Sequence, residues 1–460
     1  MIVNPNLGGI LNQPPYPSGC EIFSEPDRRS TFSASILQQI NHSFEHASQY
    51  FSISYLDGRL GYGAIATCDI PRHTLILEEP PLLPCDFLQE VVEKHERGDL
   101  KCHDDDDLLL KDYFSIDHND EDVNRLRAMV WSMHDQYAGN YHEGSDPSLF
   151  AKDSTRIDGA SSRKRLWGII YSNAFYNSES TINNANLTNE KIFRPTLHFL
   201  AAKLNHSCSP NVGYDFSSNL QMMFTTRDVK KGEELFDCYS DVVYHEPAWV
   251  RRAFLKEKYN FDCQCSACSP SFEAFQNNDM HEESLVESDN RRKSLKEIAI
   301  TLSNRIGASF LYNENFDEEI QNTVSKIRSS EFCDSDEIPT DSEDDDSWNV
   351  DINGVATNLS FSKNSGSGGN RGKFKPTSDD LYDLLDYIKL LRQEGIDHDA
   401  VDCIELAFDL AVHLNDRHVL KTYNLGNECL NLYEVSKGTN HKSTISFEKK
   451  LRKTQANLCN

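Results

Sequence analysis

Three cysteines crowded into one short segment place the strongest constraint on how this chain can fold: Cys263, Cys265 and Cys268. An odd number of cysteines at such close spacing makes a poor disulfide framework, but thiolates spaced this way suit a metal ion that needs one further ligand. Cys208 can supply that fourth thiolate. A zinc ion held by the four sulfurs would pin the end of the segment against the loop that contains Cys208.

That loop reads Asn205-His206-Ser207-Cys208-Ser209-Pro210-Asn211. Asn, Ser and Pro all favour turns, so an ordinary turn is one interpretation of the loop taken by itself. His206 is a weaker candidate for a zinc ligand than the cysteines, because Cys208 and the three downstream cysteines already complete a tetrahedron.

Composition sets broad limits on function. A chain of 460 residues with 38% hydrophobic residues can form two or three domains. The net charge of −27 repels phosphate backbones, which disfavours direct nucleic-acid binding and favours basic peptides as partners. The thirteen cysteines are mostly scattered, as expected of free thiols in a reducing compartment with one metal cluster.

No targeting or membrane segment stands out. The first residues, Met1-Ile2-Val3, lack the basic-then-apolar order of a secretory signal. No apolar run approaches the ~18 residues that a membrane span needs. We therefore expect an intracellular, monomeric protein of the nucleus, the cytoplasm or both, without membrane attachment.

Short strands are expected in the block that ends near residue 84. Apolar and polar residues alternate from Phe51 to Tyr55, which is typical of a half-buried strand. Residues 64–66 and 74–77 are further strand candidates. Gly61 and Gly63 are expected in the turn that follows the first strand.

Helices and a linker dominate the rest of the chain. Helices are expected over residues 32–48, 123–131, 288–306, 403–414 and 420–433. Another is indicated by the i, i+3, i+4, i+7 spacing of Leu381, Leu384, Leu385, Ile388 and Leu391. Glu331 to Asp351 contains ten acidic residues and no basic one, and a glycine-rich stretch follows, so a disordered linker is expected there.

Three motifs in order, NHSCxPN, GEELxxxY and CxCxxC, resemble those of SET-domain protein lysine methyltransferases, specifically the SET–MYND branch. The resemblance implies an α+β fold: a SET-domain β-fold of short strands with a pseudoknot, a post-SET zinc site, a helical insert and a helical, TPR-like C-terminal domain. The expected parts are a flexible N-terminal lead (1–50), SET domain (51–84 and 166–245), acidic helical insert (85–165), post-SET zinc segment (246–270), helical segment (271–330), linker (331–378) and helical C-terminal domain (379–460). The insert contains only Cys85 and Cys102, too few for a MYND zinc finger.

The same resemblance implies binding of S-adenosyl-L-methionine. Its expected contacts are Gly61, Tyr62, Gly63, Asn173, Asn205, His206, Tyr239 and Phe261. Glycine has no Cβ and so lets the backbone approach a ligand closely. The alternative is that Gly61 and Gly63 only shape a hairpin turn, as most such glycine pairs do. The family has a further glycine where this chain has Arg59. A helix-end asparagine is the alternative for Asn173.

Catalysis is expected from Tyr239, which ends the Gly-Glu-Glu-Leu run, together with Tyr259. The Tyr239 hydroxyl would lie between the methyl group and the entering lysine amine. Aromatic walls from Tyr259 and Phe261 suit the aliphatic stem of lysine and a sulfonium, with core packing as the alternative. For Glu233 and Glu234 a solvated turn is expected rather than a catalytic pair.

The implied function is methylation of lysines in histone or non-histone proteins, with S-adenosyl-L-methionine and zinc as cofactors. A histone tail is one candidate substrate. The alternative is a catalytically degenerate SET-fold adaptor that binds partners through its helical C-terminal module. The intact Tyr239 and Asn205-His206 pair favour the enzyme.

Overall fold

The computed structural model describes residues 29–56, 61–114, 121–135, 164–177, 194–217, 220–240, 244–268, 281–308, 311–312, 375–396 and 400–459. The chain divides into two compact units. The first comprises Met1–Cys238, Asp397–Val401 and Asn427–Asn460, and the second comprises Tyr239–Ile396 and Asp402–Gly426.

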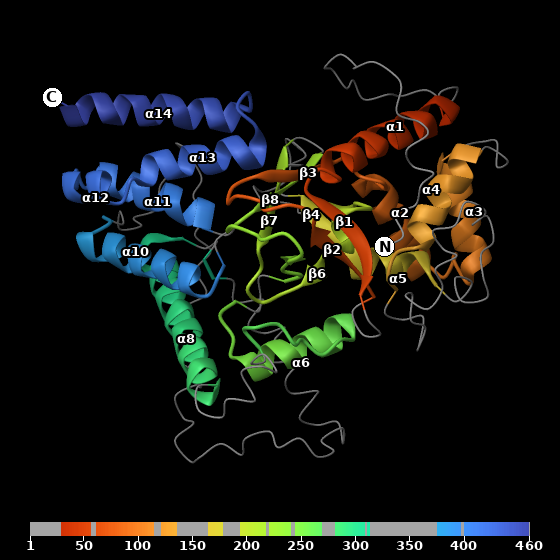
Figure 1. Ribbon diagram of the computed structural model, residues 1–460, viewed down its shortest axis with the longest axis horizontal. Helices are drawn as coiled ribbons and strands as arrows, with labels where there is room; N and C mark the ends of the chain where they lie inside the picture. Colours follow the sequence, from red (N-terminus) through yellow and green to blue (C-terminus); the bar gives the residue numbers. More distant parts are fainter. Residues whose placement is uncertain are drawn as a thin grey trace, which may run out of the picture. The chain divides into compact units, whose positions relative to one another are not determined.

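One sheet of the first unit joins four strands in the order β1-β2-β9-β6 (Figure 1). They are β1 (Phe51–Leu56), β2 (Gly61–Ala66), β9 (Glu234–Asp237) and β6 (Asn205–His206). β2 is antiparallel to both β1 and β9, whereas β6 is parallel to β9. The strand predicted from Phe51 to Tyr55 is confirmed as β1.

Gly61 and Gly63 lie inside β2, so their predicted place in a turn is wrong. Gly61 is opposite Leu56 and Gly63 is opposite Ser54 in the ladder with β1. Gly61 has a φ of +63°, which residues with a Cβ rarely adopt. A glycine can therefore mark a positive φ at the start of a strand as well as a turn, and the sequence alone does not distinguish the two.

A second sheet has the antiparallel order β3-β8-β7, and two further strands form a hairpin-like pair. The strands are β3 (Leu75–Glu79), β8 (Leu220–Thr225), β7 (Val212–Ser217), β4 (Ala174–Asn177) and β5 (Arg194–Leu197). Both sheets contribute to one hydrophobic core, in which Ile76, Leu77, Val212, Met223 and Leu235 are fully buried. This core fixes the strands that carry the candidate site residues.

Five helices of the first unit precede or interrupt the strands (Figure 1). They are α1 (Arg29–Ala47), α2 (Cys85–Glu96), α3 (His103–Phe114), α4 (Glu121–Trp131) and α5 (Leu166–Asn173). Ile36, Leu37 and Ile40 on one face of α1 join the core. The Ser43 hydroxyl donates to the Glu78 carbonyl at 2.6 Å and so ties α1 to β3.

Two carboxylates of the acidic run in α3 are structural. Buried Asp106 accepts hydrogen bonds from the Arg165 Nε and the Leu166 N–H, at 2.8 and 2.9 Å, and so receives the first turn of α5. Asp107 is paired with Arg127 of α4. Part of the acidic character predicted for the insert therefore holds α3, α4 and α5 together.

The chain after α11 (Ala400–His413) does not follow the predicted helix over 420–433. It forms α12 (Arg417–Thr422), α13 (Leu425–Lys437) and α14 (Lys442–Cys459), with a break at Asn424, whose φ is +50°. At the end of α13, Lys437 Nζ lies 2.9 Å from the Asp215 carboxylate of β7. The Lys437 carbonyl accepts a 2.8 Å hydrogen bond from Ser217. The end of α13 thus packs against β7 of the first unit.

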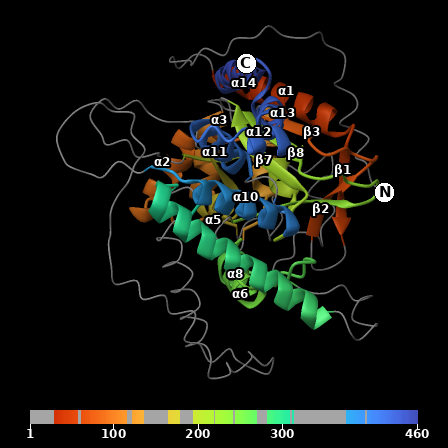
Figure 2. The same cartoon turned by 90° about the vertical axis from the view of Figure 1, so that its left-hand side faces the viewer.

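The second unit is helical in its described part. Its helices are α6 (Ala248–Tyr259), α8 (His281–Ile306), α10 (Ser378–Gln393), α12 and most of α11 (Ala400–His413). Figure 2 shows α8 as one long, continuous helix. α10 begins with a capping box between Thr377 and Asp380. The helices predicted over 288–306 and from Leu381 are confirmed, while the acidic run of the predicted linker lies outside the described residues.

Buried ion pairs organise the second unit. Glu394, directly after α10, accepts hydrogen bonds from Ser288 Oγ at 2.6 Å and from Arg292 Nε at 2.9 Å, both on α8. Arg291 completes the set around Glu394. Arg292 is fully buried and also donates to the Tyr244 carbonyl at 2.9 Å. One carboxylate therefore joins α10, α8 and the segment that leads into α6.

Glu79 is a fully buried carboxylate at the end of β3. It accepts three backbone N–H groups, from Phe199, Leu200 and Ala201, at 2.9, 2.8 and 3.0 Å. Burial raises the pKa of Glu79 to about 7, against the opposing effect of the three donors. Glu79 thus receives the start of the short helix η6 (Ala201–Lys203), which leads directly into β6.

We expect Glu79→Gln to remove part of the pH dependence of unfolding. Because the folded pKa lies above the ordinary value of 4.5, stability from Glu79 is full below that value and falls as the pH rises through about 7. Glutamine does not ionise. Between pH 4.5 and 8 the free energy of unfolding of the variant should therefore rise relative to that of the wild type by up to about 3 kcal/mol. Denaturant unfolding across this range measures the difference, with exposed Glu78→Gln as control. A difference that is constant with pH would contradict the assignment.

Candidate active site

The side-chain amide of Asn205 connects three strands of the four-stranded sheet. From β6, its Nδ2 donates to the Tyr62 carbonyl of β2 at 3.1 Å and to Glu234 Oε1 of β9 at 2.8 Å. With both amide hydrogens used in this way, the Oδ1 of Asn205 is the atom that can accept from a ligand. The structure therefore brings together the predicted residues Tyr62 and Asn205.

Gly63 lies directly against this connection. A Cβ at Gly63 would come within 2.5 Å of Glu234 Oε1, 2.5 Å of Leu56 Cδ1 and 3.0 Å of Asn205 Nδ2. Such distances force neighbouring atoms to move. Glycine at this position is thus explained by the packing of Asn205 and Glu234.

Glu234 is the functional candidate that the sequence prediction missed. Glu233 does lie on a turn and pairs with Arg227. Glu234 instead starts β9, is half-buried, and has its pKa raised by burial, an effect that its hydrogen bond from Asn205 opposes. The preceding Lys230-Lys231-Gly232 sequence signals exposure, but the period-two alternation of the strand that follows could have indicated the inward position.

Asn173 stays a prediction as a cofactor contact. It is the last residue of α5 and is buried. Its Nδ2 donates to the His134 carbonyl and to the Ile169 carbonyl, both at 2.7 Å. These bonds give Asn173 a structural role at the helix end.

His206 is oriented toward sulfur. Its Nε2 lies 3.1 Å from Cys208 Sγ, and both side chains are buried. The backbone between them is fixed, since the Ser207 N–H donates to the Asp237 carbonyl at 2.9 Å. His206 itself is paired with Asp237 in the parallel β6–β9 ladder. The structure thus links the predicted cofactor residue His206 with the predicted metal ligand Cys208.

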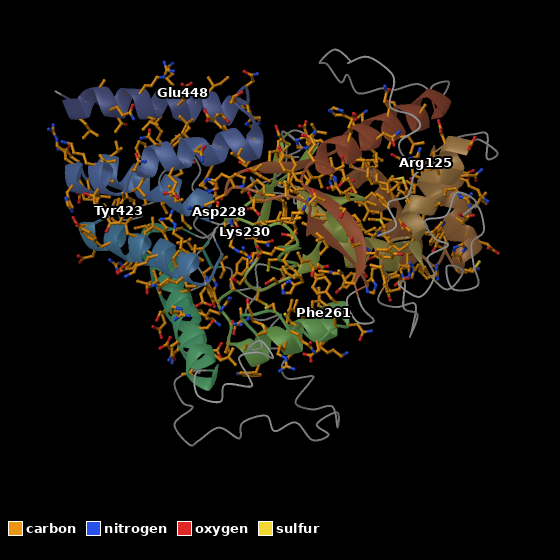
Figure 3. The ribbon with its side chains drawn as sticks, in the orientation of Figure 1. Arg125, Asp228, Lys230, Phe261, Tyr423 and Glu448 are labelled. Atoms are coloured by element: carbon orange, nitrogen blue, oxygen red, sulfur yellow. The ribbon has the colours of Figure 1, made fainter. Side chains whose placement is uncertain are left out.

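Three aromatic rings form a cluster in the second unit: Tyr239, Tyr259 and Phe261. The ring centroids of Tyr239 lie 5.3 Å from Tyr259 and 6.1 Å from Phe261, in edge-to-face arrangements. The Tyr259 hydroxyl donates to the Tyr239 carbonyl at 2.8 Å. All three residues are half-buried. Phe261 follows the end of α6 (Figure 3).

Helix α6 presents two arginines to the segment that contains Cys263, Cys265 and Cys268. Arg251 is fully buried and donates to the Ala267 carbonyl. Arg252 forms a two-bond pair with Asp262, with both N···O distances at 2.9 Å. That pair raises the pKa of Arg252, and the nearby thiols of Cys268 and Cys263 add to the effect. These cations favour the thiolate form of the cysteines.

The sulfur atoms of three predicted ligands in the second unit, Cys263, Cys265 and Cys268, lie within 4.8 Å of one another. Cys263 and Cys268 are buried and Cys265 is half-buried, while the fourth predicted ligand, Cys208, is buried in the first unit. Zn–S bonds of about 2.3 Å place the sulfurs of a tetrahedral site about 3.8 Å apart. The donor set and spacing therefore fit a metal ion of this kind.

A sequence model of the SET domain family matches residues 61–240. Residues 61–240 are a SET domain. The SET domain includes the Asn205 connection, Glu234 and Tyr239, whereas α6, Phe261 and the three clustered cysteines follow it. The predicted α+β fold of short strands with a helical C-terminal region is confirmed. The pseudoknot, the post-SET assignment and the absence of a MYND finger stay predictions.

Several known proteins are similar in sequence to parts of this chain. The chain is 29% identical over 220 residues to a putative SET domain-containing protein of Acanthamoeba polyphaga mimivirus, covering 47% of this chain and 76% of the relative. It is 38% identical over 72 residues to SET domain and MYND-type zinc finger protein 6 of Schizosaccharomyces pombe, covering 16% of this chain and 14% of the relative. It is 37% identical over 68 residues to human N-lysine methyltransferase SMYD2, covering 15% of each. The chain thus spans less than a sixth of the last two relatives.

A solved structure, the SET domain of LSMT bound to lysine and AdoHcy, aligns with 94% of this chain and 92% of its own at 12% identity, with a TM-score of 0.27. Because this score is low, the assignment of the SET domain rests on the sequence match alone. Among the described helices, none is both long and apolar enough to cross a membrane.

We expect Gly63→Ala to destabilise the first unit by about 1–3 kcal/mol, as overpacking typically does. The new methyl group would displace the Glu234 carboxylate and the Leu56 side chain. Glu234→Ala should relieve part of the cost, so the double variant should be more stable than the sum of the two single variants predicts. Denaturant unfolding of all four proteins measures this coupling. Full additivity would show that the glycine at position 63 is not required by the packing of Glu234.

Proposed function

We propose that this chain is an S-adenosyl-L-methionine-dependent protein-lysine N-methyltransferase. The observation that carries the proposal is the match of residues 61–240 to the SET domain, within which Asn205 and Tyr239 occupy the expected motifs. Human N-lysine methyltransferase SMYD2 is among the relatives with a similar segment. The proposal concerns the reaction class, with the lysine of a protein as acceptor.

The donor S-adenosyl-L-methionine supplies the methyl group. We assign its contacts to Gly61, Tyr62, Gly63, Asn173, Asn205, His206, Tyr239 and Phe261. Asn205 supports this role because its Nδ2 is committed to Tyr62 and Glu234, which turns Oδ1 into the available acceptor for an ammonium group. Burial of Glu234 and its bond to Asn205 restrict the amide to one orientation.

For the acceptor side, we assign Tyr239 and Tyr259 as catalytic residues. Methyl transfer needs a neutral amine held in line with the methyl carbon, so positioning carries most of the rate. The bond from the Tyr259 hydroxyl to the Tyr239 carbonyl holds the Tyr239 backbone. With its own hydroxyl used in this way, Tyr259 contributes a ring wall and rigidity, and Tyr239 contributes the hydroxyl that orients the amine.

We further propose that Cys208, Cys263, Cys265 and Cys268 hold one zinc ion. The thiols of Cys263, Cys265 and Cys268 lie within 4.8 Å of one another, and arginines of α6 lie beside them. This supports a structural site of the Cys₄ type with Cys208 as the fourth ligand. Zinc at such a site contributes folding energy and takes no part in the methyl transfer.

The acceptor is proposed to be a basic segment of a protein, histone or non-histone, because a net charge of −27 attracts basic peptides and repels nucleic acid. A monomeric protein of the nucleus or cytoplasm fits this partner. The helical C-terminal region would then bind the partner protein or support the SET domain.

Metal analysis tests the cysteine assignment. We expect about one zinc per chain in the wild type and a large loss of zinc in Cys263→Ser, because the remaining three thiolates leave an incomplete site. Cys403→Ser is the matched control, since Cys403 is an equally buried cysteine on α11. Folded wild-type protein without zinc, or equal zinc content in Cys263→Ser and the control, would falsify the assignment.

Single-turnover methyl transfer tests the mechanism. Tyr239→Phe keeps the ring and removes only the hydroxyl, so we expect turnover to fall about 10²–10³-fold with donor affinity nearly unchanged. Asn205→Ala should instead weaken donor binding first. Labelled donor with a protein extract measures transfer, and calorimetry measures donor affinity.

Tyr382→Phe is the control for this comparison, because Tyr382 is an exposed tyrosine of α10. It should behave like the wild type in both assays. Turnover of Tyr239→Phe within a few-fold of the wild type would make Tyr239 a core residue. An absence of donor binding by the wild type would favour a SET-fold adaptor protein.

A further inference from the structure

A hydrogen bond connects His206, which the sequence predicts to contact the methyl donor, with Cys208, which it predicts to bind the metal ion. His206 belongs to the donor-binding pair and Cys208 to the cysteine cluster. The Nε2···Sγ distance is 3.1 Å, which is short for a contact to sulfur. The imidazole is 7% exposed and the thiol is 0% exposed, so water does not compete for the contact.

The chemistry of the metal-bound state decides the direction of this hydrogen bond. A cysteine that binds zinc does so as a thiolate, which has no proton to donate. The hydrogen between the two atoms must then sit on Nε2 of His206. Hydrogen bonds to an ionised acceptor are about twice as strong as neutral ones, so the contact stabilises the thiolate.

We propose that His206 is a positioning residue for the metal cluster: its Nε2–H donates to Cys208 Sγ and holds this thiolate in the geometry that binds zinc. The proposal rests on the proposed zinc site. His206 is not a ligand in it, because the four cysteines proposed as ligands already complete a tetrahedral coordination.

The surroundings of the other cysteines support this assignment. On the segment that contains Cys263 and Cys268, positive charge comes from Arg252, whose pKa both thiols help to raise. Cys208 lies on a different loop, and there His206 provides the donor. Partners of this kind around metal ligands typically contribute 10–100-fold to metal affinity.

The geometry also has a consequence for donor binding. β6 consists of Asn205 and His206, and the two are adjacent in the ladder with β9. If Nε2 is held by sulfur, His206 meets a ligand through its backbone.

Three variants test the proposal. His206→Phe keeps a ring and removes the donor. His206→Gln places an amide Nε2–H at the same number of bonds from the backbone and so retains it. Ser207→Ala removes the bonds between the Ser207 hydroxyl and the Ser209 backbone, which tests the loop without touching sulfur.

Two measurements on the purified full-length chain separate the outcomes. Competition with a chromophoric zinc chelator should show zinc affinity reduced roughly 10-fold or more in His206→Phe, within about threefold of wild type in His206→Gln, and similarly little changed in Ser207→Ala. With cobalt(II) in place of zinc, the sulfur-to-metal charge-transfer band should move to longer wavelength in His206→Phe alone, because the thiolate has lost a hydrogen bond.

Equal zinc affinity and an unshifted cobalt band in His206→Phe would overturn the proposal. So would an equal loss in Ser207→Ala, which would assign the effect to the loop as a whole. Neither readout uses methyl transfer. A wild type that binds no zinc would instead contradict the proposed metal site, so the two failures are distinguishable.

Discussion

The side chain of Asn205 is the interaction on which the candidate site depends. Its amide joins β6 to a carbonyl of β2 and a carboxylate of β9, across sequence separations of 143 and 29 residues. A hydrogen bond to a buried charged group typically contributes about 1.5–3 kcal/mol, and losing the partner costs a similar amount. Gly63 follows from this connection, since any side chain there would displace Glu234 or Asn205. One asparagine thus explains the position of a strand, a glycine and a half-buried glutamate.

In the second unit, ion pairs and hydrogen bonds to charged side chains connect the helices. Asp289 of α8 accepts the Ala248 N–H at the start of α6, at 2.8 Å, and Arg292 one turn further along binds Glu394. Helix α6 in turn presents Arg251 and Arg252 to the cysteine segment. Buried ion pairs are sensitive to the loss of either partner, because the remaining charge has no water to solvate it. The conformation of the Tyr239 and Cys263 region is therefore tied to the helices by paired charges as well as by apolar packing.

Much of the local structure was predictable from the sequence. The alternation from Phe51, the leucine spacing from Leu381 and the apolar pattern of residues 288–306 each report a repeating side-chain period, and a period is a local property. The grouping of Cys263, Cys265 and Cys268 was also predictable from their close spacing, and their sulfur atoms lie within 4.8 Å of one another.

The sequence by itself determined the match of residues 61–240 to the SET domain and most helices and strands, since both depend on residue types and their spacing. Only the tertiary structure decided which polar groups are buried. Lys230-Lys231-Gly232 signalled exposure for Glu234, yet pairing with β2 turns it inward to Asn205. Gly61 and Gly63 signalled a turn, yet both lie in β2, where Gly61 has a positive φ and Gly63 has close neighbours. The sequence predicted different functions for His206 and Cys208, yet the turn after β6 brings His206 Nε2 to 3.1 Å from Cys208 Sγ. Burial depends on contacts between residues far apart in the chain, and no local pattern encodes those contacts.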